Sequence, residues 1–207
     1  MKKPSWRRGL EKRGGFWRNA RWYDLHLERR LPLAFPMFEE MVQALPPLDD
    51  GAHVCDMACA TGNTTFTLLT AYPDVHLTLL DEADDLLAVA AEKISEFEPE
   101  ARLMRADISR DGDALPGGPY DIVVSGLALE RLVGEEATPA EAETRCELLY
   151  RSVFDALVPG GHLIVGDQVE ALGLYRLMKA MERAGFIDVD CAWRQDDFFV
   201  IGGRVPE

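Results

Sequence analysis

Short apolar runs and stretches with helical spacing alternate along this chain. Runs typical of buried strands occupy residues 54–55, 76–80, 102–106 and 121–125, and further strands are expected after the glycines at 160–161 and over 186–190 and 198–201. Helices are expected from Asn63, over 172–184, and over 33–45, where the apolar positions are Phe35, Phe38, Met41, Val42 and Leu45. This alternation predicts an α/β fold with a largely parallel sheet.

The first four of these strands end in acidic or small polar residues. Asp56, Asp81 and Asp107 follow the first three runs, and Ser125 closes the fourth. Because right-handed crossovers bring parallel strands out at one edge of a sheet, these four side chains are expected to lie together. A single aspartate at a strand end is more often a helix cap or a solvated loop residue. The prediction therefore depends on all four occurring in sequence.

The nine residues V-C-D-M-A-C-A-T-G, from Val54 to Gly62, predict a strand ending in an acid, a loop of small residues, and a helix from Asn63. Open α/β sheets bind adenosine-containing cofactors at such a loop, and an acid that binds the ribose is expected about 20 residues later, where Asp81 stands. The alternative is an ordinary strand–turn–helix. The spacing differs from the G-x-G-x-x-G of a dinucleotide loop.

The loop residues Asp56, Ala58, Ala60 and Gly62 resemble, in spacing, the D-x-G-x-G-x-G motif of class I methyltransferases that depend on S-adenosylmethionine (SAM), with alanine at the first two glycine positions. Residues 157–165 resemble the L-x-P-G-G-x-L-x-V segment of the same family, and residues 16–24 resemble the segment ending in Tyr-Asp that precedes the core of its small-molecule members. This resemblance implies a Rossmann-like three-layer sandwich. Its seven-stranded sheet would be mostly parallel with the last strand antiparallel, and an N-terminal helical lid would cover the site.

The resemblance also implies a set of cofactor-binding residues. Asp56 would lie beneath the methionine moiety, Asp81 would accept hydrogen bonds from the ribose hydroxyls, and Asp107 would receive the adenine amino group. The set also includes the small residues of the loop, Ile108 packed on the adenine ring, Tyr23 of the lid and Ser125 below the pocket. In full it comprises Tyr23, Asp56, Ala58, Ala60, Gly62, Asp81, Asp107, Ile108 and Ser125. At Ala58 and Ala60 the methyl side chain is expected to demand a φ below zero and to leave less room for the cofactor.

Composition predicts one compact intracellular domain. The 207 residues are 47% hydrophobic, enough for one sizeable core. No apolar run approaches the roughly 18 to 20 residues of a membrane span, and the basic start lacks the apolar stretch of a secretory signal, so a cytoplasmic location is expected. The four cysteines have no metal-ligand spacing, and we expect reduced thiols and no metal site. No oligomeric state follows from the sequence.

Charge divides the chain into a basic arm, residues 1–30, and an acidic body, residues 31–207, which is the predicted SAM-binding domain. The arm holds ten Lys or Arg against three acids, a net of +7 within a chain of −14, so the body carries −21. Its basic residues alternate with aromatic ones, a pattern that can bind RNA. The preferred interpretation is a helical lid folded on its own domain, because a strongly acidic body repels polyanions.

The segment after the fourth strand, residues 125–132, indicates the class of acceptor. It lacks the Asn/Asp-Pro-Pro-Tyr tetrad used to methylate planar nitrogens and resembles the A-L-H-H-L segment of small-molecule enzymes, with Glu130 at one histidine position. Glu130 is interpreted as a helix carboxylate paired with Arg131 or water rather than as a base. Residues 134–143 are expected to form a flexible loop. No catalytic residue is assigned.

Three functions follow from these patterns. The preferred one is a SAM-dependent methyltransferase that acts on a small molecule. The alternatives are an RNA methyltransferase of the tRNA type, with residues 1–30 binding the RNA, and a non-catalytic SAM-binding module, which Ala58 and Ala60 would permit.

Overall fold

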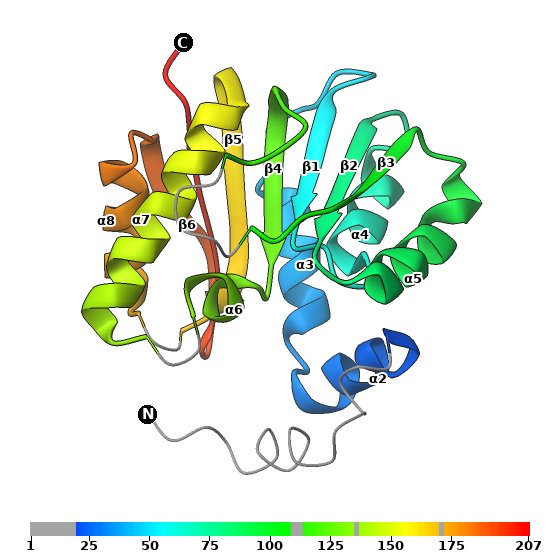
Figure 1. Cartoon of the computed structure of the whole chain (residues 1–207), viewed down its shortest axis with the longest axis horizontal. Helices are drawn as coiled ribbons and strands as arrows, with labels where there is room; N and C mark the ends of the chain where they lie inside the picture. Colours follow the sequence, from blue (N-terminus) through cyan, green and yellow to red (C-terminus); the bar gives the residue numbers. More distant parts are fainter. Residues whose placement is uncertain (1–19, 109–113, 135–136, 170–171) are drawn as a thin grey trace.

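The computed structural model describes residues 20–108, 114–134, 137–169 and 172–207, and these form a seven-stranded sheet flanked by helices (Figure 1). The strands are β1 (His53–Met57), β2 (His76–Asp81), β3 (Ala101–Arg105), β4 (Tyr120–Gly126), β5 (Leu157–Gln168), β6 (Ile187–Gln195) and β7 (Phe198–Arg204). The helices are α2 (Ala20–Arg30), α3 (Ala34–Gln43), α4 (Asn63–Ala71), α5 (Asp84–Ile94), α6 (Leu129–Val133), α7 (Pro139–Ala156) and α8 (Leu174–Arg183), with a 3-10 turn at Ser95–Phe97.

The strands lie in the order β3-β2-β1-β4-β5-β7-β6. β1 to β5 pair in parallel, and β7 runs antiparallel to both β5 and β6. The predicted sheet, mostly parallel with an antiparallel last strand, is confirmed. Because the chain order reverses between β1 and β4, the carboxyl ends of these two strands flank the position where such sheets bind ligands.

Two separate cores show that the sheet is the middle of three layers. Alternate residues of each strand point to opposite faces, so that Leu79 belongs to the core that includes residues of α3, α4 and α5, while Leu80 belongs to the core that includes residues of α6, α7 and α8. Both side chains are fully buried. Figure 1 shows α4 behind the sheet and α6 and α7 in front of it.

Helix α3 lies close against the ends of β4 and β5. Four of the five predicted apolar positions between 35 and 45 are buried, but Phe35 is 36% exposed, and its ring lies nearly perpendicular to that of Phe38. Two glycines of the sheet make room for the helix: a Cβ at Gly126 would come within 2.8 Å of the Phe38 ring, and one at Gly166 would collide with the sulfur of Met41.

Two local predictions were wrong. The fifth strand was expected to begin after Gly160 and Gly161, but β5 begins at Leu157; the chain still changes course at the glycines, where Gly160 has a φ of 79° and the register against β4 shifts between Leu157 and His162. The expected loop over 134–143 ends early because α7 begins at Pro139, where Thr138 and Glu141 form a capping box.

The third small residue of the loop after β1 serves helix packing. Gly62 adopts a left-handed φ of 74°, and a Cβ placed there would lie 3.0 Å from the Cβ of Ala90 in α5. The close approach at Gly62 is therefore made by a neighbouring helix of the same chain.

We predict that Gly62→Val lowers the free energy of unfolding by about 2–4 kcal/mol, through left-handed strain and overpacking against α5. Gly160→Val is the matched control, since Gly160 has a similar φ of 79° but no atom near the added Cβ. The control should lose only about 1–2 kcal/mol. Urea unfolding of both variants measures the difference, and equal losses would contradict the proposed contact.

Candidate functional site

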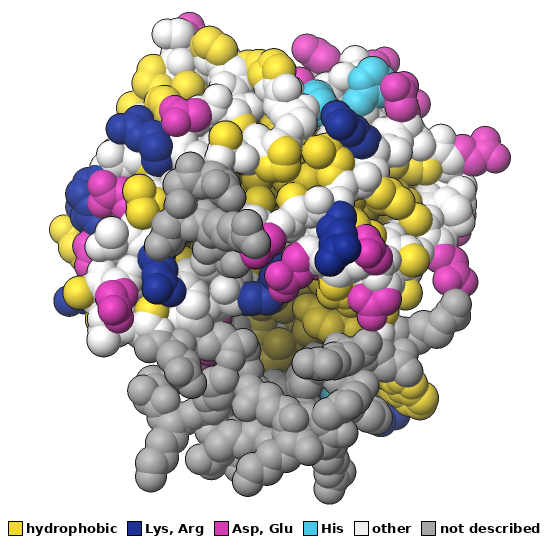
Figure 2. All heavy atoms as spheres, in the orientation of Figure 1, with side chains coloured by type: hydrophobic (Ala, Val, Ile, Leu, Met, Phe, Trp, Pro, Cys, Tyr) yellow, Lys and Arg dark blue, Asp and Glu magenta, His cyan; other side chains and the backbone are white. Residues whose placement is uncertain are grey.

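The carboxyl ends of β1, β2 and β4 bring three of the predicted residues to one edge of the sheet. Asp56, Asp81 and Ser125 are each 1% exposed there. Figure 2 shows a recess with a hydrophobic floor at this edge, below paired acidic and basic side chains. Asp107 follows β3 on the same edge but is exposed, and Ile108 is half-buried.

Asp81 holds the loop after β1. Its Oδ2 accepts a hydrogen bond of 3.0 Å from the backbone N–H of Ala60, and its Oδ1 accepts one of 3.0 Å from the N–H of Ala83. The carboxylate therefore fastens the loop to the end of β2 and also fixes the start of the chain leading into α5.

Asp56 joins the end of β1 to the start of α4. Its Oδ2 accepts hydrogen bonds from the hydroxyl of Thr65 at 2.5 Å and from the Thr65 backbone N–H at 3.2 Å. Burial raises the pKa of Asp56 to about 7, against the lowering effect of the two Thr65 hydrogen bonds, and the charge of Asp81 raises it further. Within the described residues, Asp56 Oδ1 is buried without a hydrogen-bond partner, as is the Oγ of Ser125.

The loop between these two aspartates contains backbone that side chains rarely adopt. Ala58 has a φ of 58° and Ala60 a φ of 48°. The expectation that the alanines would hold φ below zero was wrong: the loop keeps the left-handed conformation in which glycine is normally found. Each alanine costs roughly 1–2 kcal/mol in this conformation, and the Asp81 carboxylate binds the strained segment at Ala60.

Helix α2 brings Tyr23 into the electrostatic environment of this edge. The Tyr23 pKa is raised to about 12, mainly by burial, with Arg131 lowering it and the acids Asp24, Asp81 and Asp167 raising it. The phenol therefore stays protonated near neutral pH. The role of Tyr23 at the site stays a prediction, and residues 1–19 of the predicted arm lie outside the described residues.

Arg131 is a residue of this edge that the sequence did not single out as part of the site. Its guanidinium lies 2.6 Å from Glu82 Oε1 and 3.9 Å from Asp81 Oδ2, so it reaches from α6 to the end of β2. The sequence suggested Glu130 as a partner of Arg131 only because the two residues are adjacent. The contact of Arg131 with Glu82 joins segments about 50 residues apart, and no sequence pattern predicts it.

Asp167, at the end of β5, orients the segment after β4. Its Oδ2 accepts a hydrogen bond of 2.8 Å from the N–H of Leu129, the first residue of α6, and its Oδ1 accepts one of 2.7 Å from Gln168. Burial raises the Asp167 pKa to about 6, although the backbone hydrogen bonds lower it. Asp167 therefore acts as a cap of α6 and fixes the wall that carries Arg131.

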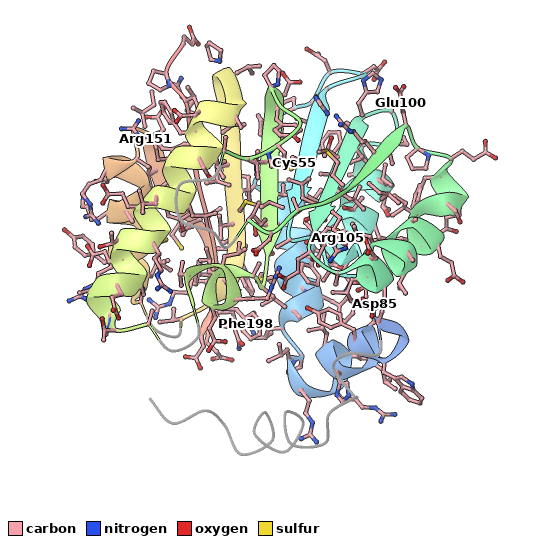
Figure 3. The ribbon with its side chains drawn as sticks, viewed as in Figure 1. Cys55, Asp85, Glu100, Arg105, Arg151 and Phe198 are labelled. Atoms are coloured by element: carbon pink, nitrogen blue, oxygen red, sulfur yellow. The ribbon has the colours of Figure 1, made fainter. Side chains whose placement is uncertain are left out.

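The four cysteines are free thiols, and three of them are buried, including Cys59 in the loop after β1, whose Sγ donates to the backbone oxygen of Ala60 at 3.7 Å. Figure 3 places Cys55 in the middle of the sheet, and its side chain is fully buried. In the described part of the chain, no group of three or more His, Cys, Asp or Glu side chains is arranged to hold a metal ion. No described helix is long and apolar enough to cross a membrane.

A match to a known family identifies the class of protein in which this site occurs. The family described as "Methyltransferase domain" matches residues 48–194, which include the loop, both buried aspartates and the segment after β4. The chain belongs to this methyltransferase family.

Relatives and solved structures agree with this assignment. The chain is 29% identical over 119 residues, 58% of its length, to a trans-aconitate 2-methyltransferase of Paracidovorax citrulli, and 30% identical over 131 residues, 61% of its length, to one of Streptomyces avermitilis. It spans only 40% and 43% of those two proteins.

Among solved structures, the apo SAM-dependent methyltransferase SibL superposes with a TM-score of 0.66 at 22% identity, over 90% of this chain and 59% of SibL. An O-methyltransferase family protein from Burkholderia thailandensis gives 0.69 at 15% identity, over 92% and 61% of the two chains. These likenesses show the fold.

We predict that Ala58→Gly and Ala60→Gly each raise the free energy of unfolding by about 0.5–1 kcal/mol, since relief of left-handed strain exceeds the added entropy of the unfolded chain. Ala106→Gly is the control, because Ala106 also lies in a loop at this edge but has no positive φ. The control should lose about 0.4–1 kcal/mol. Thermal or urea unfolding gives the sign, and a loss in all three variants would refute relief of strain.

We also predict a pH dependence that depends on Asp56. Because the folded pKa, about 7, lies above the ordinary value of 3.8, the contribution of Asp56 to stability is fully present below pH 3.8 and is lost as pH rises through about 7. Asp56→Asn should abolish this loss, on the order of 2–4 kcal/mol between about pH 4 and pH 8. Urea unfolding across that range measures it, with the exposed Asp74→Asn as the control that keeps the wild-type slope. An unchanged slope in Asp56→Asn would exclude the buried, protonated carboxyl.

Proposed function

We propose that this chain binds SAM at the carboxyl edge of β1, β2 and β4 and transfers its methyl group to a small-molecule acceptor. The observation that carries the proposal is the left-handed loop held between two buried aspartates, Asp56 and Asp81, within a methyltransferase-family domain. Because the chain spans less than half of its curated relatives, the activity is proposed rather than transferred from them.

The polar groups of the site fit an adenosyl cofactor. Each Asp81 oxygen accepts one backbone hydrogen bond, and a carboxylate has about four lone-pair sites, so both oxygens can also accept from ribose hydroxyls. Asp56 Oδ1 and Ser125 Oγ are buried polar atoms without partners in the described chain, and buried polar atoms are normally satisfied by a partner or by water. We assign the methionine end to these two atoms, and the adenine to Asp107 and Ile108.

The bound cofactor would supply a methyl group activated on a positively charged sulfonium. The chain's own residues would position and enclose it. Tyr23, kept protonated, would lie on the α2 side of the site, where helix α2 would help to exclude water. Asp167 would keep the wall formed by α6 in place. Much of the rate enhancement would come from holding the acceptor in line with the methyl group.

The relatives indicate which acceptors to test first. Several are named trans-aconitate 2-methyltransferase, so trans-aconitate and other small carboxylic acids come before other acceptors. RNA is not proposed, because that hypothesis depends on residues 1–30, of which 1–19 lie outside the described part of the chain.

We predict that the full chain binds SAM and that Asp81→Ala weakens the affinity by at least about tenfold, since it removes acceptors for the ribose and the anchor of the loop. Isothermal titration with SAM measures both. Asp85→Ala is the control: Asp85 is an exposed acid of α5 near the same edge, labelled in Figure 3, and its removal should leave affinity unchanged.

Turnover is tested separately with SAM carrying a labelled methyl group and a panel of small acids. Labelled product supports the proposed enzyme. Tight SAM binding without product from any acceptor would favour a non-catalytic SAM-binding module, and no SAM binding by the wild-type chain would refute the proposed function.

A further inference from the structure

A polar cluster joins helix α2 to the loop after β1 and to helix α5. The carboxylate of Asp24 is its centre: Oδ1 accepts hydrogen bonds from the Thr61 hydroxyl at 2.5 Å and from the Asn63 side-chain amide at 2.9 Å. Oδ2 lies 2.7 Å from the ammonium group of Lys93 in α5. One carboxylate therefore connects three segments that lie far apart in the sequence.

Lys93 closes the cluster from the other side. Its ammonium group donates to Asn63 Oδ1 at 2.5 Å and to Thr61 Oγ1 at 3.4 Å. The Lys93 side chain is only 19% exposed and that of Asp24 35%, so these charges are shielded from solvent more than a surface ion pair. In each of these contacts a donor faces an acceptor, and a polar network whose groups are paired in this way favours one arrangement.

The attachment points of the cluster lie within the proposed cofactor loop. Thr61 and Asn63 flank Gly62, and Thr61 directly follows Ala60, whose N–H is held by Asp81. On the α2 side, Asp24 directly follows Tyr23. The contacts that fix Asp24 therefore also restrict where the backbone of Tyr23 lies relative to the loop, because the two residues are adjacent in one helix.

We infer that Asp24 is a positioning residue: it clamps α2 to the cofactor loop and thereby sets Tyr23 over the site. The inference rests on the proposed SAM-binding function and adds a role for Asp24 and Lys93. Asp24 does not contact the reacting atoms. It acts by keeping the loop and α2 in the geometry that binds SAM, so its loss should affect cofactor affinity more than the stability of the sheet.

The test is SAM affinity, measured by isothermal titration on the full chain. Asp24→Ala should raise the dissociation constant at least about tenfold, because three partners lose their shared acceptor. Asp24→Asn keeps an acceptor for Thr61 but loses the charge facing Lys93, and should show an intermediate loss. Glu28→Ala, an exposed acid one turn further along α2, is the matched control and should bind SAM as the wild type does.

Two further measurements separate positioning from a general loss of structure. If Asp24 acts through Tyr23, Asp24→Ala should have less than about a threefold effect in a Tyr23→Ala background, since coupled residues are not additive. Hydrogen exchange should become faster in α2 of Asp24→Ala while the strands keep their protection.

The outcomes distinguish this inference from the proposed function. Failure of the wild-type chain to bind SAM overturns the function on which the inference rests. Normal SAM binding by wild type together with unchanged binding by Asp24→Ala, or fully additive effects with Tyr23→Ala, overturns the clamp and leaves the function intact.

Discussion

The structure of the site depends on two buried acids, one of which holds the middle of the loop after β1 and the other the start of the helix that follows it. Asp56 fixes the start of α4 through Thr65, and Asp81 fixes the middle of the loop through the N–H of Ala60. Neither acid is exposed, so each is costly to bury unless its oxygens are paired. This cost favours the observed loop conformation, because a conformation that broke these bonds would leave further buried acceptors without donors.

That constraint explains how alanine occupies positions at which the resemblance implies glycine. A left-handed alanine is unfavourable by an amount comparable to one good hydrogen bond, and the charge-assisted bond from Ala60 to Asp81 offsets it. Gly62, in contrast, cannot become alanine without displacing Ala90 of α5. The three small residues of the motif therefore have different physical roles. Ala58 and Ala60 adopt a strained backbone conformation, which Asp81 stabilises at Ala60, and Gly62 provides space for a helix.

The sequence predicted most of the fold because its signals are local. Apolar runs placed the strands, and the small-residue loop placed the start of α4 at Asn63, as the structure confirms. The capping box at Thr138 and Glu141 is also a local signal, and it marks the start of α7 at Pro139. Because this signal was not used, the first turn of α7 was expected to be a loop. Side-chain partners could not be predicted in this way. Asp24 and Lys93, or Arg131 and Glu82, meet only because the topology brings distant segments to the same edge, and no spacing in the chain records that.

The same topology couples the floor of the site to its cover. Asp81 holds the loop through the backbone N–H of Ala60, and Asp24 holds it through the side-chain hydroxyl of Thr61, so one acid of the sheet and one of α2 bind adjacent residues of the loop. A movement of α2 away from the sheet must break the Asp24 contacts or pull on a segment whose conformation is already strained. Strain at Ala58 and Ala60 thus makes the loop sensitive to what α2 does, whereas a relaxed glycine loop could follow the helix at little cost. The two alanines therefore make the shape of the loop depend on the position of α2, through the contacts of Asp24 with Thr61 and Asn63.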